Sequence, residues 1–434
     1  MSFVSKYIVR FKTQIQNLSI YMLASLIPML ISMVSNPFVA KNMSPTDYAI
    51  TGYYTAFNSL LGPLVSFYLI NYYTKRFFEY KEEERKKLRA TILKMLIVFS
   101  FFMFFVALVG VYIYTTLFNK GSQLPFFPFA LMALLPLPLN GVFSLSLVDF
   151  RMTRDSKRFF KYSVSKGLMT TVLMVLFVVF FKMGALGYLG STLVIAFVFF
   201  LFLLYKNKDQ LKIPFNKKTA KDSILFCWPL VIASMLTFFS NGYDKVFLER
   251  TGDVLALGIY SVGFSMANHL HVFSNSINDT FQPDIYESIV KRNFLRCLRV
   301  VVIKLLLMAG VVGLFIVFAP FLVRILTAGR YMDSTPFARI LSLASITSMM
   351  YYSMSQVTVA FGFTSITLIN KILGSALSVL SFSLLIPAYG AYGAAWGGVL
   401  SYFYFFLGNV VLVLIKYKHT LKYENRNTDI SSSN

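Results

Sequence analysis

The sequence predicts an all-α polytopic membrane protein with twelve transmembrane helices in two six-helix lobes. Three observations predict this class: an apolar composition, long stretches without charge, and an internal repeat. Hydrophobic residues make up 57% of the 434 residues, charged residues only 14%, and the mean hydropathy is +0.65. A soluble protein of this size has about a quarter of its residues charged. The composition therefore excludes a single soluble globule.

The predicted helices follow from the stretches that lack Asp, Glu, Lys and Arg. A bilayer-spanning helix needs about 20 mainly apolar residues, and most of these stretches hold one span. The charge-free run 372–415 is long enough for two spans, with the Pro/Gly-rich segment IPAYGAYGAAWGG as the turn between them. Two further spans each carry a lysine, Lys166 near the start of one and Lys304 inside the other. In chain order, the predicted helices lie near residues 18–38, 48–70, 92–114, 126–148, 164–183, 187–205, 224–243, 256–280, 301–321, 337–360, 366–387 and 394–415.

The basic residues predict how these helices are oriented. The chain has a net charge of +23, from 41 Lys+Arg against 18 Asp+Glu. If the N-terminus, the even-numbered connections and the C-terminal tail share one side, that side holds 31 of the 41 basic residues. Positive residues stay on the cytoplasmic side of a membrane, so both termini are expected in the cytoplasm. The excess charge thus reports orientation, and nucleic-acid binding is not expected.

The second half of the chain repeats the first. Gly184 pairs with Gly390, Lys166 with Lys371 and Lys94 with Lys304, all at offsets near 206. An even-numbered unit repeats in the same direction, which is typical of transporters with a substrate site between the halves. The predicted organisation is an N-terminal lobe, a cytoplasmic linker, a C-terminal lobe and a polar cytoplasmic tail, at residues 1–210, 211–222, 223–416 and 417–434.

Polar side chains recur at helical spacing on several predicted spans. Polar groups are costly against hydrocarbon, so such faces should meet protein or water. The strongest stripe lies in 256–280 and continues past it; shorter stripes lie on 18–38, 48–70, 224–243 and 337–360. Interhelical packing is the alternative, and it is favoured for the isolated Ser and Thr positions. The stripes predict a hydrophilic substrate cavity between the halves, with candidate contacts at Asn36, Asn58, Asn241, Asp244, Asn268, His271, Asn275 and Gln356.

A few basic residues lie away from the cytoplasmic side or inside the spans. Lys41, Lys245, Arg250 and Arg324 follow outer helix ends, and Lys371 opens a helix. Each could instead snorkel to the headgroups, so they are candidate contacts for an anionic substrate. His271 could also titrate as a proton-coupling group. The three histidines show no metal-ligand spacing, and no cofactor or metal is expected. Cys227 and Cys297 are expected to be free thiols, and no cleavable signal peptide is evident.

Several segments of the chain resemble those of a known family. They are NPFVAKNMSPTDYAITGYYTAFNSL and KRFFEYKEEERKKLRAT in the first half, and DKVFLERTGDVLALGIYSVG and GAYGAAWGG in the second. Over about residues 15–416 the chain resembles the polysaccharide exporters and O-antigen flippases of the multidrug/oligosaccharidyl-lipid/polysaccharide (MOP) superfamily. The resemblance implies a MATE-like, V-shaped fold of two lobes in the bacterial cytoplasmic membrane. It also implies transport of undecaprenyl-diphosphate-linked oligosaccharide to the outer leaflet, with glycosyltransferases and a polymerase of the same pathway as partners beside membrane lipids. The family's usual lysine between helices 10 and 11 is missing from AFGFTSIT.

Two other functions compete with this one. A drug or cation antiporter of the same superfamily would favour carboxylates in its cavity, and the one acid on a stripe is Asp244. A membrane glycosyltransferase or polymerase would need a sizeable outer loop or a paired acidic motif, which the short outer loops do not provide. We therefore expect a transporter and not an enzyme.

Overall fold

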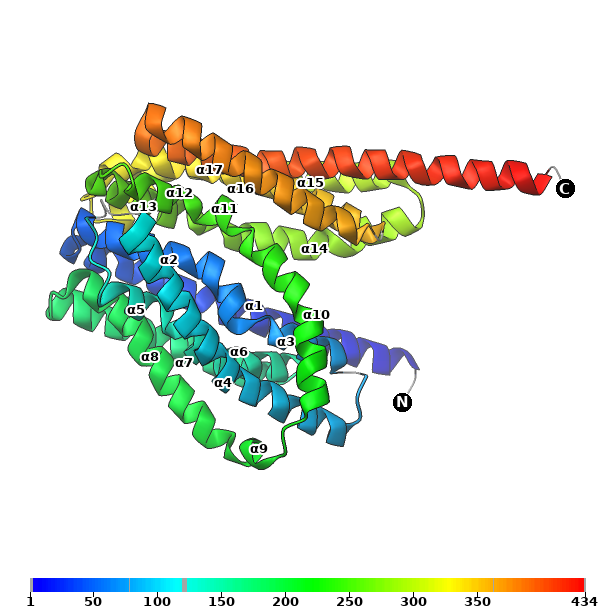
Figure 1. The fold of residues 1–434 in the computed structure, drawn as a ribbon, viewed down its shortest axis with the longest axis horizontal. Coiled ribbons are helices and arrows are strands. Elements are labelled where there is room, and N and C mark those ends of the chain that lie inside the picture. Colours follow the sequence, from blue (N-terminus) through cyan, green and yellow to red (C-terminus); the bar gives the residue numbers. More distant parts are fainter. Residues whose placement is uncertain (1–2, 78, 119–122, 362, 433–434) are drawn as a thin grey trace. The chain divides into compact units, whose positions relative to one another are not determined.

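The computed structural model describes residues 3–77, 79–118, 123–361 and 363–432, and these residues form helices without any strand (Figure 1). The chain divides into two compact units. Unit 1 comprises Met1–Met235 with Arg324–Arg330, and unit 2 comprises Leu236–Val323 with Tyr331–Asn434. The lobe boundaries expected at residues 210 and 223 stay a prediction.

Unit 1 contains the first ten helices and two short π-helical turns. They are α1 (Phe3–Asn42), α2 (Pro45–Ser66), α3 (Leu69–Arg76), α4 (Glu82–Ile113), η1 (Tyr114–Phe118), α5 (Phe129–Leu134), α6 (Pro136–Met152), α7 (Ser156–Val175), η2 (Leu176–Phe180), α8 (Gly184–Lys206), α9 (Lys208–Lys212) and α10 (Lys217–Met235). A core of buried Leu, Ile, Val, Phe and Tyr side chains joins α3, α4, α6 and α8.

The start of α2 shows how local sequence signals position the helices of unit 1. The Ser44 hydroxyl accepts from the backbone N–H of Asp47, whose carboxylate in turn accepts from Ser44, which forms a capping box. The other carboxylate oxygen of Asp47 accepts a 2.8 Å hydrogen bond from the Ala185 N–H at the start of α8. Asp47 therefore ties the starts of α2 and α8 together.

Unit 2 contains the remaining helices. They are α11 (Phe238–Asn241), α12 (Tyr243–Glu249), α13 (Val254–Asn268), α14 (Leu270–Val290), α15 (Phe294–Leu326), the 3₁₀ turn η3 (Met332–Ser334), α16 (Thr335–Ala360) and α17 (Thr364–Ser432). The span predicted at 224–243 is divided among α10, α11 and α12, because non-helical Gly242 (φ −155°) separates α11 from α12. The span predicted at 256–280 is divided between α13 and α14 at His269.

The last two predicted spans both lie in α17, which changes direction at Gly390. Gly390 has φ 54° and ψ −130°, a non-helical conformation inside the helix. Figure 1 shows the orange and red parts of α17 running side by side in opposite directions, and the Asn370 amide donates to the Phe405 carbonyl at 2.8 Å across them. Gly184, the partner of Gly390 in the predicted repeat, has the same left-handed φ of 51°. The two glycines thus share a positive φ at the positions that the repeat pairs.

The helices are long and apolar enough for a multi-pass membrane protein. Within the described ranges, seven helices meet the length and composition required of a membrane span. Large apolar side chains stand exposed along them, among them Val98, Phe321 and Leu384, as a hydrocarbon surround requires. Each of the twelve predicted spans falls largely on helical residues. The number of twelve spans and the cytoplasmic position of both termini stay predictions.

Candidate functional site

A small polar cavity of about 30 Å³ lies inside unit 2. Its wall combines hydroxyl, amide, imidazole, phenol and carboxyl groups with a few apolar side chains. The lining residues are Ser240, Asn241, Asp244, Phe264, Ala267, Asn268, His271, Leu341, Ala344, Ser345, Gly398 and Tyr402. Four of the predicted contacts, Asn241, Asp244, Asn268 and His271, meet here. They come from four helices that the sequence predicted as two spans.

The interruption at Gly242 is what brings Asn241 and Asp244 to one wall. The α11 helix ends at Asn241 and α12 begins at Tyr243. The Asn241 side-chain oxygen accepts a 2.6 Å hydrogen bond from the Tyr402 hydroxyl on α17. Asn241 is half-buried, and its bond to a residue on another helix holds its amide in one orientation.

Asp244 carries a carboxylate that is only partly satisfied. It is 3% exposed, and its Oδ2 accepts a 2.5 Å hydrogen bond from the Tyr260 hydroxyl on α13. The Lys245 ammonium lies 3.8 Å from the same oxygen. In the part of the chain that the structure describes, its Oδ1 accepts no hydrogen bond. Since an unsatisfied buried acceptor is costly, this oxygen is a candidate contact for a solute.

Lys245 is placed differently from its neighbour. It is 4% exposed, its ammonium stands 3.2 Å from the centre of the Phe264 ring, and it is not among the residues that line the cavity. A cation over an aromatic face is stabilised when it is shielded from water. In this structure Lys245 is the internal counter-ion of Asp244, and a direct contact with substrate stays a prediction.

The other predicted contacts of unit 2 lie outside the cavity. Asn275 is exposed on α14 and Arg250 is exposed after α12. Gln356 on α16 accepts a 2.9 Å hydrogen bond from the Lys304 ammonium on α15, and Lys304 itself is fully buried. Lys371 on α17 is half-buried. Their roles in binding stay predictions.

The predicted contacts of unit 1 are spread over its helices. Asn36 and Asn58 are half-buried, whereas Lys41 and Arg324 are exposed. The backbone carbonyl of Lys41 accepts a hydrogen bond from the Arg330 guanidinium within this unit. The cavity predicted between the two halves, to which these residues would contribute, stays a prediction.

Three aromatic residues of the site carried no signal in the sequence. Tyr260 binds Asp244 from 16 residues away, Tyr402 binds Asn241 from 161 residues away, and Phe264 covers Lys245. In a chain with 17% aromatic residues, single Tyr and Phe positions cannot be distinguished by composition.

Within the described ranges, no group of three or more His, Cys, Asp and Glu side chains could hold a metal ion. Cys227 and Cys297 are free and buried.

These helical spans, with polar groups gathered inside a unit of apolar helices, define a multi-pass membrane protein. The chain belongs to the polysaccharide biosynthesis protein family, whose profile matches residues 15–287. No curated protein matches the sequence.

Among the solved structures with a similar fold are a flippase and MATE transporters. One is the lipid II flippase MurJ in an inward closed conformation, with a TM-score of 0.68 and 13% identity over 91% of this chain and 87% of that one. Another is an inward-facing multidrug resistance MATE transporter of the MOP superfamily, with a TM-score of 0.65 and 15% identity over 92% and 99%. A MATE transporter from Vibrio cholerae gives a TM-score of 0.55 and 14% identity over 95% and 97%.

Proposed function

We propose that this protein moves lipid-linked oligosaccharide, joined to undecaprenol through a diphosphate, from the inner to the outer leaflet for surface polysaccharide synthesis. Membership of the polysaccharide biosynthesis family supports this proposal most strongly. The flippase and MATE folds support a transport cycle of alternating access between two helical units. The same proposal places the protein in the bacterial cytoplasmic membrane with both termini inside. Its proposed partners are the glycosyltransferases and the polymerase of the pathway.

The polar cavity of unit 2 supports a sugar-containing substrate. Its amides, hydroxyls and imidazole can each donate or accept a hydrogen bond, which is what sugar hydroxyls require. A diphosphate-sugar headgroup cannot cross hydrocarbon unaided, because its desolvation is too costly. An inside-negative potential helps two negative charges outward by roughly 4.6 kcal/mol per 100 mV, so export of this anion does not require a coupling ion.

One observation favours a second function, that of a drug or cation antiporter. Asp244 presents an oxygen without a hydrogen bond at the wall of the cavity, and a carboxylate there would attract a cationic solute. The Lys245 ammonium, 3.8 Å from the other Asp244 oxygen, opposes that attraction. The flippase remains the stronger proposal because the family match concerns polysaccharide biosynthesis.

Deleting the gene separates the two functions. A flippase deletion should remove surface polysaccharide and leave lipid-linked repeat units in the inner leaflet, where a membrane-impermeant sugar-modifying reagent cannot reach them from outside. An antiporter deletion should leave the polysaccharide intact and lower the inhibitory concentrations of cationic drugs. Normal polysaccharide together with increased drug sensitivity would reject the flippase.

Two variants of the cavity test the site. His271→Ala combined with Asn268→Ala removes two polar groups from the cavity wall without touching the Asp244 pair, and surface polysaccharide should fall at least tenfold. Thr280→Ala is the matched control on α14, because the exposed Thr280 hydroxyl bonds only to the Ser276 carbonyl of its own helix. Asn275→Ala, in the exposed position, tests whether binding extends beyond the cavity. Equal protein levels on a membrane blot are required for each comparison.

A further inference from the structure

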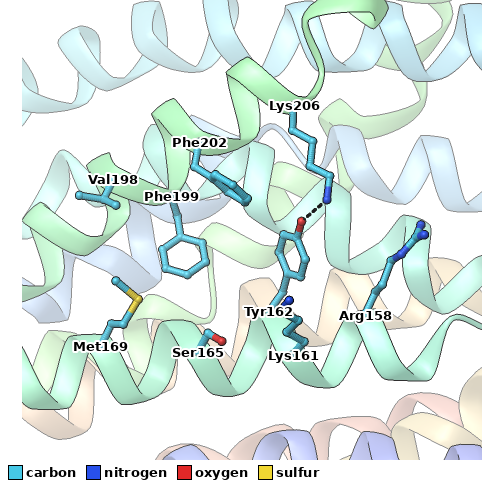
Figure 2. Close-up of a pocket in the computed structure, with 9 residues that line it drawn as sticks. All are labelled: Arg158, Lys161, Tyr162, Ser165, Met169, Val198, Phe199, Phe202 and Lys206. Carbon is cyan, nitrogen blue, oxygen red and sulfur yellow. Dashed lines mark hydrogen bonds between the residues drawn. The ribbon is translucent and has the colours of Figure 1, made fainter.

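A second cavity, of about 440 Å³, lies in unit 1 between α7 and α8 (Figure 2). Its residues come from the first turns of α7, after its start at Ser156, and from the last turns of α8, before its end at Lys206. The groove therefore lies at one surface of the membrane. The distribution of basic residues in the sequence predicts that this surface is the cytoplasmic one.

One side of the groove is apolar. Phe199 is 8% exposed and forms part of the buried core, whereas Phe202 and Met169 are 48% and 42% exposed. Figure 2 shows Phe199 and Met169 along the part of the groove away from the three cations, and Phe202 between Phe199 and Lys206, whose ammonium lies 6.0 Å from the centre of the Phe202 ring. Such a wall suits an acyl chain, because it presents no polar group that hydrocarbon would leave unpaired.

The other side of the groove is cationic. Arg158, Lys161 and Lys206 line it, and none of the described residues in its lining is acidic. The Lys206 ammonium donates a 2.6 Å hydrogen bond to the buried Tyr162 hydroxyl, which holds it over the groove (Figure 2). Arg158 is also 3.2 Å from Asp155, but its side chain is 66% exposed, and such exposed pairs contribute little. Three cations beside an apolar wall complement a phosphate joined to acyl chains.

A larger groove in the same unit lacks this combination of cations and apolar side chains. That groove, of about 760 Å³, has Lys94 as its only basic lining residue among those described. The Lys94 ammonium is already engaged by the Ile213 carbonyl at 2.6 Å. This larger groove therefore offers a lipid an apolar surface. Of these two grooves, the α7–α8 groove is the one that combines acyl-chain and phosphate chemistry.

We infer that the α7–α8 groove is a binding site for an anionic phospholipid of the cytoplasmic leaflet, whose phosphodiester contacts Arg158, Lys161 and Lys206. Basic pockets between transmembrane helices on the cytoplasmic side bind such headgroups in other membrane proteins. The inference does not depend on which solute the protein carries. The occupant is a structural lipid, which binds while the transport substrate uses another site.

The test measures lipid binding to the purified full-length protein in detergent, by native mass spectrometry and by thermal unfolding. Phosphatidylglycerol should bind at least tenfold more tightly than phosphatidylcholine and should raise the unfolding temperature. Lys206→Gln and Arg158→Gln should each weaken phosphatidylglycerol binding by about tenfold, because each removes a charge-assisted hydrogen bond. Binding of phosphatidylcholine should not change.

Two control variants distinguish the groove from general surface charge. Lys157→Gln and Lys208→Gln each remove one positive charge. Lys157 is one residue from Arg158 and Lys208 is two residues from Lys206, and both are exposed and do not line the groove. They should change phosphatidylglycerol binding less than twofold. Equal losses in control and groove variants, or equal binding of the two phospholipids, would overturn the inference. Tighter binding of farnesyl diphosphate than of phosphatidylglycerol, with the same dependence on Lys206, would overturn it too, since the groove would then receive the transport substrate.

Discussion

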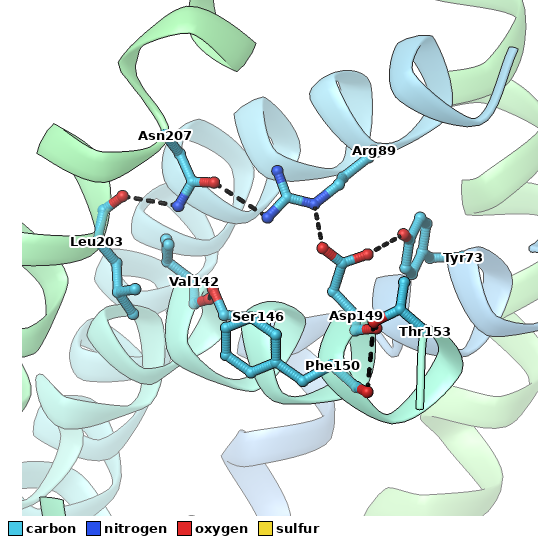
Figure 3. A network of polar contacts seen from close by, with 9 residues as sticks. All are labelled: Tyr73, Arg89, Val142, Ser146, Asp149, Phe150, Thr153, Leu203 and Asn207. Carbon is cyan, nitrogen blue, oxygen red and sulfur yellow. Dashed lines mark hydrogen bonds and ion pairs between the residues drawn. The ribbon is translucent and has the colours of Figure 1, made fainter. Parts of the chain in front are cut away.

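The guanidinium Nε of Arg89 on α4 lies 3.0 Å from Oδ2 of Asp149 on α6, and this contact centres a network that joins four helices (Figure 3). The Tyr73 hydroxyl on α3 donates to the other Asp149 oxygen at 2.6 Å, and the Arg89 Nη2 donates to the Asn207 side chain after α8 at 3.0 Å. Burial, and next the charge of Asp149, raise the pKa of Tyr73, so its phenol keeps the donated proton. The network thus fastens one end of unit 1.

Asp149→Asn should destabilise the protein by about 1–3 kcal/mol, because Arg89 and Tyr73 would lose their charged acceptor. Both side chains of the ion pair are mostly buried, 13% and 24% exposed. The free energy of unfolding of the purified protein measures this effect. Lys86→Gln is the control, because its ion pairs with Glu82 and Glu83 are exposed and such pairs contribute little to stability. Equal losses in both variants would contradict a role for the network.

Asp244→Asn should destabilise unit 2 more than Tyr260→Phe does. The first change leaves the buried Lys245 ammonium without a counter-ion and should cost about 3–5 kcal/mol. The second removes only the phenol that donates at 2.5 Å and should cost about 1–3 kcal/mol. The double variant Asp244→Asn with Lys245→Met should recover much of the stability. A double variant no more stable than Asp244→Asn would show that Lys245 does not depend on Asp244.

The helices of this fold were predictable, but the breaks within them were not. Stretches poor in charge predict helices because charge is excluded from hydrocarbon, and each of the twelve predicted ranges falls largely on helical residues. Periodicity reports only the spacing of residues along a helix, so it gave two continuous spans without the interruptions at Gly242 and His269. For the same reason the stripe spacing placed Asn268 and His271 on one face but could not tell that Asn275 lies outside the cavity.

The repeated lysines show a similar limit. The sequence pairs Lys94 with Lys304, yet Lys94 donates to a backbone carbonyl and Lys304 to the Gln356 side chain. A repeat predicts where a side chain lies in its helix. Its partner depends on the residues of the neighbouring helix, and those residues differ between the halves.

Gln356→Leu should destabilise the protein by about 1–3 kcal/mol, because it leaves the fully buried Lys304 ammonium without this acceptor. Replacing both residues, by Lys304→Met with Gln356→Leu, should be close to neutral, since buried polar pairs exchange well for apolar ones. The unfolding free energies of the wild type, the two single variants and the double variant form a double-mutant cycle. Arg299→Gln, at an exposed position, is the control. Surface polysaccharide measured in the double variant then separates the two roles of Gln356: a loss at restored stability would assign it to transport, whereas normal levels would assign it to packing.

Gly390→Ala should destabilise α17 by about 1–3 kcal/mol, because φ 54° with ψ −130° is a conformation that residues with a Cβ rarely adopt. Gly393→Ala should also destabilise α17, since its added Cβ would overlap the backbone carbonyl of Leu385, which cannot move aside as a side chain could. Gly310→Ala in α15 is the matched control: no atom lies within 4 Å of its added Cβ, and alanine is the better helix former by about 1 kcal/mol. Unfolding free energies should therefore fall for Gly390→Ala and Gly393→Ala and stay level or rise for Gly310→Ala. If Gly390→Ala matched the control, the chain could reverse without the left-handed residue, and the shared φ of Gly184 and Gly390 would not be a requirement of the repeat.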